Sequence, residues 1–202
     1  MSHRMTFALA AAALFAVISG SAAAQSFEGR KKCSSCHKSQ AESWGDTAHA
    51  KAMDSLKPGT KEEAKKRAKL DPKKDYTKDK DCVGCHVDGW GKEGGYTVDD
   101  PSKFLTGVGC ESCHGPGAKH ADSAEAKDIR NPAKLTPSEV DKSCLTCHKN
   151  QPTQTGRIRG GHFRNEVGCT SCHSIHAEPA KLVSRSAAKI NEKCASCHTD
   201  VW

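Results

Sequence analysis

Residues 110–114 have the sequence Cys110-Glu-Ser-Cys113-His114, and this Cys-x-x-Cys-His pattern occurs six times in the 202-residue chain. Two cysteines at this spacing can each bond one vinyl group of a single haem, and the histidine that follows lies where it can bind the iron. The pattern therefore predicts six covalently bound haem c groups, attached through Cys33, Cys36, Cys82, Cys85, Cys110, Cys113, Cys144, Cys147, Cys169, Cys172, Cys194 and Cys197. The predicted proximal iron ligands are His37, His86, His114, His148, His173 and His198.

These motifs use every cysteine of the chain, which argues against other roles for the thiols. Structural zinc sites combine two cysteine pairs and do not require a histidine after each pair. A disulfide framework, which is common in small exported proteins, gives no reason for the histidines either. A thioredoxin-like redox site would have a single Cys-x-x-Cys pair. Covalent haem attachment explains all six copies.

The N-terminus is typical of a secretory signal peptide. Arg4 precedes an apolar run over residues 6–20, and small residues follow at 21–24. The run is shorter than the roughly 20 residues that a membrane-spanning helix needs. We therefore predict a signal peptide over residues 1–24 and a periplasmic protein that has no integral membrane span after cleavage. An uncleaved N-terminal anchor is the alternative.

The composition indicates a fold that depends on its cofactors. Only 36% of the residues are hydrophobic and 5% are aromatic, which is low for a chain that builds its own core. We expect a mainly α fold with much irregular coil, in which the chain of a multihaem c-type cytochrome wraps around six stacked haems. The net charge of +7 becomes about −6 once the signal peptide is removed and twelve haem propionates are added, so nucleic acid is excluded as a partner.

Helices are predicted from local patterns at four places. Thr60 and Glu63 have the spacing of a capping box, and Thr136-Pro137-Ser138-Glu139 combines a cap residue with an N1 proline. The predicted helices cover residues 40–56, 60–70, 136 to at least 144, and 184–198.

Four histidines of the mature chain lie outside the motifs, and we predict that they are distal iron ligands: His49, His120, His162 and His176. Six irons each need a second axial ligand, so two irons lack a distal histidine. His176 lies three residues after His173, on the proximal side of that haem, and we expect it to reach a neighbouring iron. The same is expected of His120, six residues after His114.

The first half of the chain resembles the tetrahaem cytochrome c-554 family. The resemblance covers about residues 27–117, and the matching stretches are Phe27-Glu-Gly-Arg-Lys-Lys-Cys33-Ser-Ser-Cys36-His37, Trp44-Gly-Asp-Thr-Ala-His49-Ala-Lys-Ala-Met53, Cys82-Val-Gly-Cys85-His86-Val-Asp-Gly and Gly107-Val-Gly-Cys110-Glu-Ser-Cys113-His114-Gly-Pro-Gly117. It implies periplasmic electron transfer, a largely helical fold and closely stacked haem pairs.

The second half is similar instead to the repeat units of periplasmic decahaem electron-conduit cytochromes. The residues that carry this resemblance are Cys144-Leu-Thr-Cys147-His148, His162 and Cys169-Thr-Ser-Cys172-His173-Ser-Ile-His176. We therefore expect an N-terminal three-haem region at 25–120, which resembles cytochrome c-554, and a C-terminal three-haem region at 121–202.

The c-554 resemblance also implies that the haem of His86 is five-coordinate. We expect the second incomplete haem at His198, since the chain ends four residues later. Its sixth position would be open, filled by water, or filled by a histidine from another molecule. Met53, which the family does not use as a ligand, and lysine are the alternative ligands within the chain.

These expectations favour an electron-transfer relay between redox partners. A hydroxylamine-oxidising enzyme and a quinol-linked membrane cytochrome are the partners that the resemblance suggests, which places the protein in nitrogen metabolism. One alternative is a nitrogen-oxide reductase that reduces nitric oxide, nitrite or hydroxylamine at an open haem of His86. Another is a subunit of a porin–cytochrome conduit or of a haem filament. No catalytic residue is assigned, and an electron carrier is favoured over an enzyme.

Overall fold

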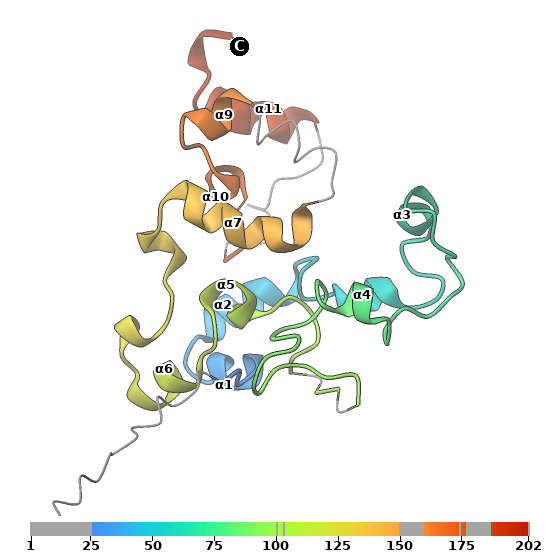
Figure 1. Ribbon diagram of the computed structural model, residues 1–202. Coiled ribbons are helices and arrows are strands. Elements are labelled where there is room, and N and C mark those ends of the chain that lie inside the picture. Colours follow the sequence, from blue (N-terminus) through green and yellow to red (C-terminus); the bar gives the residue numbers. More distant parts are fainter. Residues whose placement is uncertain are drawn as a thin grey trace, which may run out of the picture.

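The computed structural model describes residues 26–99, 101, 102, 104–149, 160–173, 175, 176 and 187–201 (Figure 1). Within these residues the chain consists of helices and irregular coil, and its only β pairing is an isolated antiparallel bridge between Val87 and Thr106. The predicted mainly α fold with much coil is confirmed. The predicted signal peptide lies outside the described residues. No helix in the described part is long and apolar enough to cross a membrane.

Most helices are only one or two turns long. The first half contains α1 (Arg30–Ser34), α2 (Lys38–Gly45), η1 (Met53–Leu56), α3 (Glu62–Arg67), α4 (Lys80–Val83), α5 (Cys110–His114) and α6 (Ala118–Ser123). The second half contains η2 (Ala126–Asp128), η3 (Pro132–Lys134), α7 (Pro137–His148), α9 (Gly161–Arg164), α10 (Cys169–Cys172), α11 (Ala187–Ala195) and η5 (Thr199–Val201). Helices this short are not stable alone in water, so tertiary contacts must hold them.

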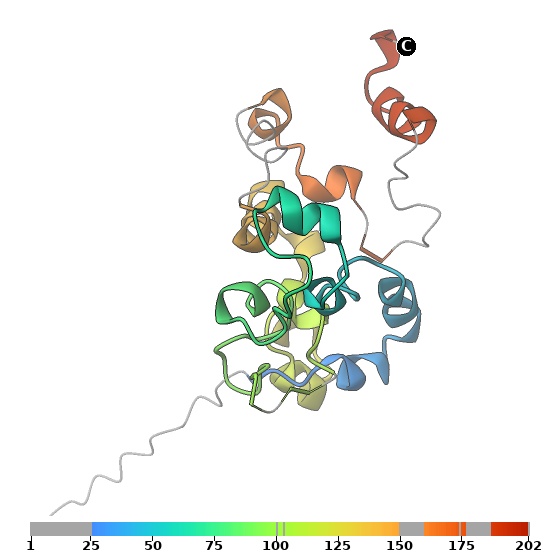
Figure 2. The same ribbon diagram turned by 90° about the vertical axis from the view of Figure 1, so that its right-hand side faces the viewer.

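The helices that carry cysteine motifs follow one another through the molecule. Helix α1 contacts α2 and α5, α5 contacts α7, and α7 contacts α10. Figures 1 and 2 show α1 and α6 at one end of the molecule and α9 and α11 at the other. The segment that contains α3 projects from this body as an arm, with α4 at its base (Figure 1).

The protein part of the core is small. The buried hydrophobic side chains form two clusters that share partly buried neighbours, Met53, Trp90 and Val98. One cluster consists of Leu56, Tyr76 and Val83, and the other of Val87, Tyr96 and Leu105. Both lie around the second cysteine motif, so the chain supplies little apolar interior around the other described motifs, as expected if cofactors supply it there.

The helix predicted over residues 40–56 is wrong in its extent. Helix α2 ends at Gly45, and only Met53–Leu56 forms a further 3-10 turn. The Thr47 hydroxyl donates to the carbonyl oxygen of Trp44 at 2.7 Å and accepts from the amide of Ala50 at 3.2 Å. These local bonds replace the helical pattern, because a threonine side chain can compete for backbone partners.

The helix predicted over residues 60–70 is shorter, at Glu62–Arg67, and its expected cap is wrong. The Thr60 hydroxyl donates to the carbonyl oxygens of Asp54 and Lys57 and does not cap the helix. Lys61, in a left-handed conformation with φ 46°, is the N-cap residue.

The helix predicted to begin at residue 136 is confirmed. It is α7, in which the Thr136 hydroxyl accepts from the Glu139 amide and the Glu139 carboxylate accepts from the Thr136 amide. This reciprocal cap stabilises the longest helix of the described residues, which carries Cys144 and Cys147. The last predicted helix corresponds to α11, and its first predicted residues, 184–186, lie outside the described part.

Candidate haem-binding site

Each cysteine motif lies on a short helix or at the end of one. The third motif makes up the whole of α5, and the fourth forms the end of α7. The others begin on α1, α4, α10 and α11 and continue into the turn that follows. None of the twelve cysteines, all of which lie in the described residues, forms a disulfide, and each is at least partly exposed, so every motif presents both sulfurs for attachment.

The four histidines outside the motifs each lie beside a motif histidine. The ring centroids are 6.1 Å apart in His37 and His120, 6.0 Å in His49 and His148, 5.9 Å in His114 and His176, and 5.9 Å in His162 and His198. Two of these pairs are stacked, with interplanar angles of 24° for the first and 9° for the third.

This separation fits two imidazoles that bind one metal ion from opposite sides. Two metal–nitrogen bonds of about 2 Å, with half of each ring added, put the centroids about 6 Å apart. In the described residues no group of three or more His, Cys, Asp or Glu side chains could hold an ion. The other coordination positions would therefore come from a planar group between the rings, which is the arrangement that a haem requires.

Backbone carbonyl groups orient several of these rings. The Nδ1 atom of His86 lies 2.7 Å from the carbonyl oxygen of Ala52. The Nδ1 atom of His114 lies 2.9 Å from that of Arg130, and the Nδ1 atom of His120 lies 3.0 Å from that of Glu125. A carbonyl oxygen can only accept, so Nδ1 carries the proton and Nε2 keeps its lone pair for a metal.

Partial desolvation favours the neutral form of two distal candidates. Desolvation, and then the His148 ring, hold the pKa of His49 below its ordinary value. Desolvation, followed by the rings of His114 and His37, lowers the pKa of His176 in the same way. A neutral imidazole is the form that binds a metal ion.

Contacts between thiols bring motifs together in pairs. The Cys33 thiol donates a hydrogen bond to Cys110, and this bond is the main cause of the raised pKa of Cys33, which places the first motif against the third. Burial, and then a hydrogen bond with Cys85, raise the pKa of Cys147 to about 12, which places the second motif against the fourth. A cavity lies between the first and third motifs, lined among others by His37, Trp44, His49, Cys110, His114 and His176.

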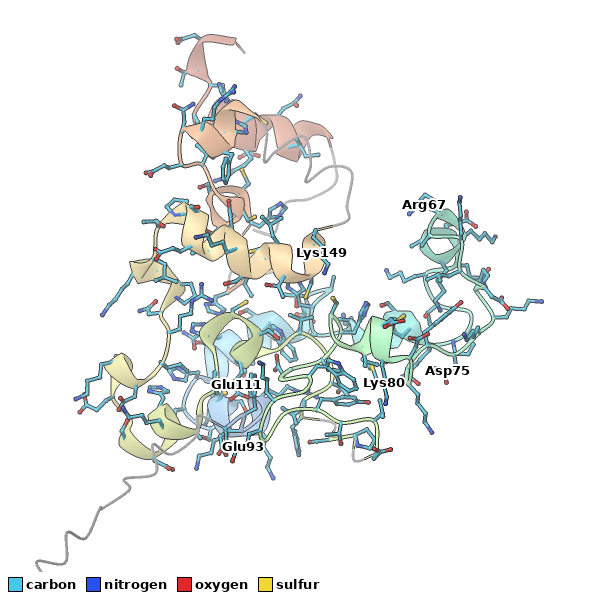
Figure 3. All side chains as sticks on the ribbon, in the orientation of Figure 1. Arg67, Asp75, Lys80, Glu93, Glu111 and Lys149 are labelled. Atoms are coloured by element: carbon cyan, nitrogen blue, oxygen red, sulfur yellow. The ribbon has the colours of Figure 1, made fainter. Side chains whose placement is uncertain are left out.

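Glu111, inside the third motif, joins it to the first. Its side chain is among the buried charged groups, with 2% of the residue exposed. The carboxylate accepts hydrogen bonds from the amides of Glu28 at 3.0 Å, Gly29 at 2.8 Å and Gly117 at 2.7 Å. Figure 3 shows Glu111 within the body of the molecule, next to α1 and α5. One buried carboxylate thus fixes the entry to α1 and the turn after α5.

Two further buried carboxylates cap motif helices from a distance. Asp88 accepts from the amides of Gly109 at 3.0 Å and Ser112 at 3.1 Å, at the beginning of α5. Asp141, on α7, accepts from the amide of Cys169 at 2.7 Å, at the beginning of α10. Each of the two aspartates is 1% exposed. A negative charge at a helix N-terminus satisfies free amides and interacts favourably with the helix dipole.

Arg130 connects the third and fourth motifs. Its carbonyl oxygen accepts from His114, and its guanidinium donates to the Ser143 hydroxyl at 2.5 Å and to the Glu139 carbonyl oxygen at 3.2 Å. This arginine therefore sets the orientation of a motif ring relative to α7.

Sequence reasoning missed Glu111, Asp88, Asp141 and Arg130. One signal was available for the two aspartates. The sequence Val-Gly-Cys-x-Ser-Cys-His occurs at 108–114 and again at 167–173, and the glycine before each first cysteine has no side chain with which to cap its helix. A cap from elsewhere is then required, although the sequence does not say from where.

The pairing of the last motif histidine also differs from expectation. We expected His198 to lack a partner, but His162 lies beside it. In the described residues no histidine ring is paired with His86 or His173. Met53 packs against both hydrophobic clusters, as a core residue does.

Comparison with known proteins identifies the family. The family model described as cytochrome c554 and c-prime matches residues 32–115. The solved structure of reduced cytochrome c554 from Nitrosomonas europaea is 56% identical, with a TM-score of 0.53, and the match covers 64% of this chain and 68% of that one. The chain belongs to the cytochrome c-554 family. It is therefore a multihaem c-type cytochrome that binds haem c covalently and functions in electron transfer.

The c-554 similarity extends further than residue 117, where we expected it to end. Cytochrome c-554 of Nitrosomonas europaea is 55% identical over 167 residues, which are 82% of this chain and 66% of that protein's length. A model of NrfB-like c-type cytochromes matches residues 110–197. The cytochrome c-type protein NrfB of Escherichia coli is 28% identical over 122 residues, which are 59% of this chain and 64% of NrfB. The multiheme cytochrome MtrA of Shewanella baltica is 29% identical over 105 residues, which are 50% of this chain and 30% of MtrA.

Proposed function

We propose that this c-554 relative is a periplasmic hexahaem cytochrome that relays electrons between redox partners. The observation that carries the proposal is the set of four histidine pairs, each with ring centroids about 6 Å apart, as axial ligands of one iron would be. Bound haem supplies one-electron chemistry between ferric and ferrous iron, with a potential set by ligands, hydrogen bonds and burial.

The chain attaches, orients and shields the cofactors. The twelve motif cysteines would attach six haems, and the motif histidines would be proximal ligands. His120, His176, His49 and His162 would be the distal ligands opposite His37, His114, His148 and His198, in that order. The carbonyl groups that accept from Nδ1 hold the rings in place, and Glu111, Asp88 and Asp141 hold the motif helices.

The packing of the motifs supports a path for electrons. The first motif lies against the third and the second against the fourth, and α5, α7 and α10 contact one another in series. We also propose the division into haem regions at 25–120 and 121–202, which is supported by the two family models that meet at residues 110–115.

The projecting arm is the proposed docking surface for an acidic redox partner. Residues 57–80 contain ten lysines and arginines against five acidic residues. The arm is built around Tyr76, whose hydroxyl accepts from the Asp71 amide at 2.9 Å, and around the buried Lys65, which donates to the Lys57 carbonyl oxygen. Arg67 lies at its far end (Figure 3). Such a basic surface steers an acidic protein toward the second motif, at the base of the arm.

A hydroxylamine-oxidising enzyme and a quinol-linked membrane cytochrome are the partners we propose to test. Arg67→Glu with Lys69→Glu should weaken binding at low ionic strength several-fold, and the difference should shrink as salt is added. If the double variant and the unmodified protein bind the partner with equal affinity, the arm is ruled out as the docking surface.

A second candidate function is reduction of nitrogen oxides at the haem of His86, which is the histidine for which the c-554 resemblance implies a free sixth position. Its Nδ1 is held by the Ala52 carbonyl oxygen, and no described histidine is paired with it. Adding nitric oxide to the reduced protein separates the two functions. Multiple turnovers would favour the enzyme, whereas binding or a stoichiometric oxidation would favour the relay.

Two measurements test the relay directly. Intact mass of the secreted protein should show six haems, and a potentiometric titration should show all six exchanging electrons. A mass with fewer haems, or haems that do not titrate, would contradict the proposal.

A further inference from the structure

The chain has a fixed number of histidines that could bind iron, and the structure shows which of them lie side by side. Four are distal candidates, and all four are paired with motif histidines from other parts of the chain. The remaining motif histidines are His86 and His173. The c-554 resemblance implies a free sixth position on the haem of His86. His173, in contrast, lies outside residues 32–115, which the cytochrome c554 family model matches.

We propose that the haem of His173 has an exchangeable sixth position that binds small neutral ligands such as carbon monoxide and nitric oxide. This inference rests on the proposed attachment of six haems. It gives the protein a second ligand-binding iron, in addition to the one at His86.

The local structure directs the nearby histidines away from this iron. His176, only three residues after His173, lies beside His114 with the rings almost parallel. His162, on α9 just before the motif, lies beside His198. Met53, the only methionine after the predicted signal peptide, packs in the core around the second motif. No histidine or methionine of the mature chain is therefore left to bind this iron.

The fifth motif is both held and accessible. Asp141 caps α10 at 2.7 Å, and α10 packs on α7, so the protein fixes the proximal side. Cys172 and His173 are exposed. The motif therefore lies at the surface of the described chain, where a haem attached to it would be close to solvent.

The same assignment of histidines also predicts whether copies of the chain can be linked by a histidine of one copy that binds an iron of the next. A second copy of the chain has no histidine to donate, since each of its distal candidates is paired internally. We therefore expect no filament linked by a histidine from a neighbouring molecule.

Carbon monoxide is the probe we choose, because it forms a coordinate bond to ferrous iron and no electron is transferred. The dithionite-reduced protein, with its haem content measured from intact mass, should bind two molecules of carbon monoxide per chain in a Soret titration. One or none would overturn the inference. A mass with fewer than six haems would instead overturn the proposed function, so the two failures are distinguishable.

Variants locate the second site. Cys169→Ala with Cys172→Ala removes the fifth attachment point and should reduce the bound carbon monoxide from two to one. His162→Ala opens the sixth haem and should raise it from two to three. An unchanged count in the first variant would overturn the assignment to His173. If that variant does not accumulate, electron paramagnetic resonance of the unmodified oxidised protein decides: two high-spin ferric irons support the inference, and one overturns it.

Discussion

Replacing Glu111 by glutamine should destabilise the protein strongly, although the two side chains have nearly the same shape. In the structure one carboxylate oxygen accepts from Glu28 and Gly117, and the other accepts from Glu28 and Gly29. Glutamine keeps a single acceptor oxygen. Its amide nitrogen is a donor, so it must face a backbone N–H group that is also a donor, and that group loses its hydrogen bond to this side chain.

The magnitude follows from two contributions. A buried donor left unsatisfied costs about 1–3 kcal/mol, and the loss of charge on the remaining hydrogen bonds weakens each by about 1 kcal/mol. Because these effects are not fully additive, we expect the free energy of unfolding to fall by about 2–4 kcal/mol. With a guanidinium dependence of about 4 kcal/mol per molar, the unfolding midpoint should fall by about 0.5–1 M.

The assay is equilibrium unfolding of the haem-loaded protein in guanidinium chloride, followed by far-ultraviolet circular dichroism. Glu93→Gln is the matched control, because Glu93 is exposed and the substitution removes the same charge. Both glutamates are labelled in Figure 3. The control should shift stability by less than about 0.5 kcal/mol. Equal midpoints for the two variants would refute the role assigned to the buried carboxylate.

Three further predictions concern single substitutions that should destabilise the protein. Gly109→Ala should cost about 1–3 kcal/mol in thermal unfolding, because its new Cβ would lie 2.1 Å from a carboxylate oxygen, whereas Gly45→Ala, with nothing within 4 Å, should be neutral or stabilising. Asp141→Ala should cost about 1–2 kcal/mol and speed hydrogen exchange at the Cys169 amide; unchanged exchange would show that the cap is dispensable. The pKa of Asp128 is lowered by its hydrogen bond with a lysine 2.6 Å away, so its stabilisation is present above the ordinary pKa of aspartate and is lost as pH falls through the lowered value. Asp128→Asn should therefore be less stable than the unmodified protein near neutral pH, with the difference vanishing in acid; a difference that is constant with pH would contradict this.

Sequence patterns predicted elements where the deciding interactions are local. The cap of α7 was predictable because Thr136 and Glu139 are three residues apart and bond to each other's backbone. The helix predicted over 40–56 failed for a tertiary reason as well as a local one: the Trp44 indole donates to the Val108 carbonyl oxygen at 2.9 Å, and the chain turns at Thr47 to follow that contact. Propensity could not reveal a partner 64 residues away.

The supports of the site were beyond sequence reasoning for the same reason. Glu111 bonds to amides 82 and 83 residues earlier in the chain, and Asp141 to one 28 residues later. An acidic residue in a charged sequence has no feature that marks it as buried, because burial is decided by what packs around it.

The sequence by itself predicted the attachment points and the number of histidines that could bind iron, because the Cys-x-x-Cys-His pattern is contained within five consecutive residues. Only the tertiary structure decided which histidine faces which. The members of the four pairs are between 36 and 99 residues apart, and no local rule connects them. Ring separation is set by packing between helices, so the pairing of the histidines depends on the folded chain.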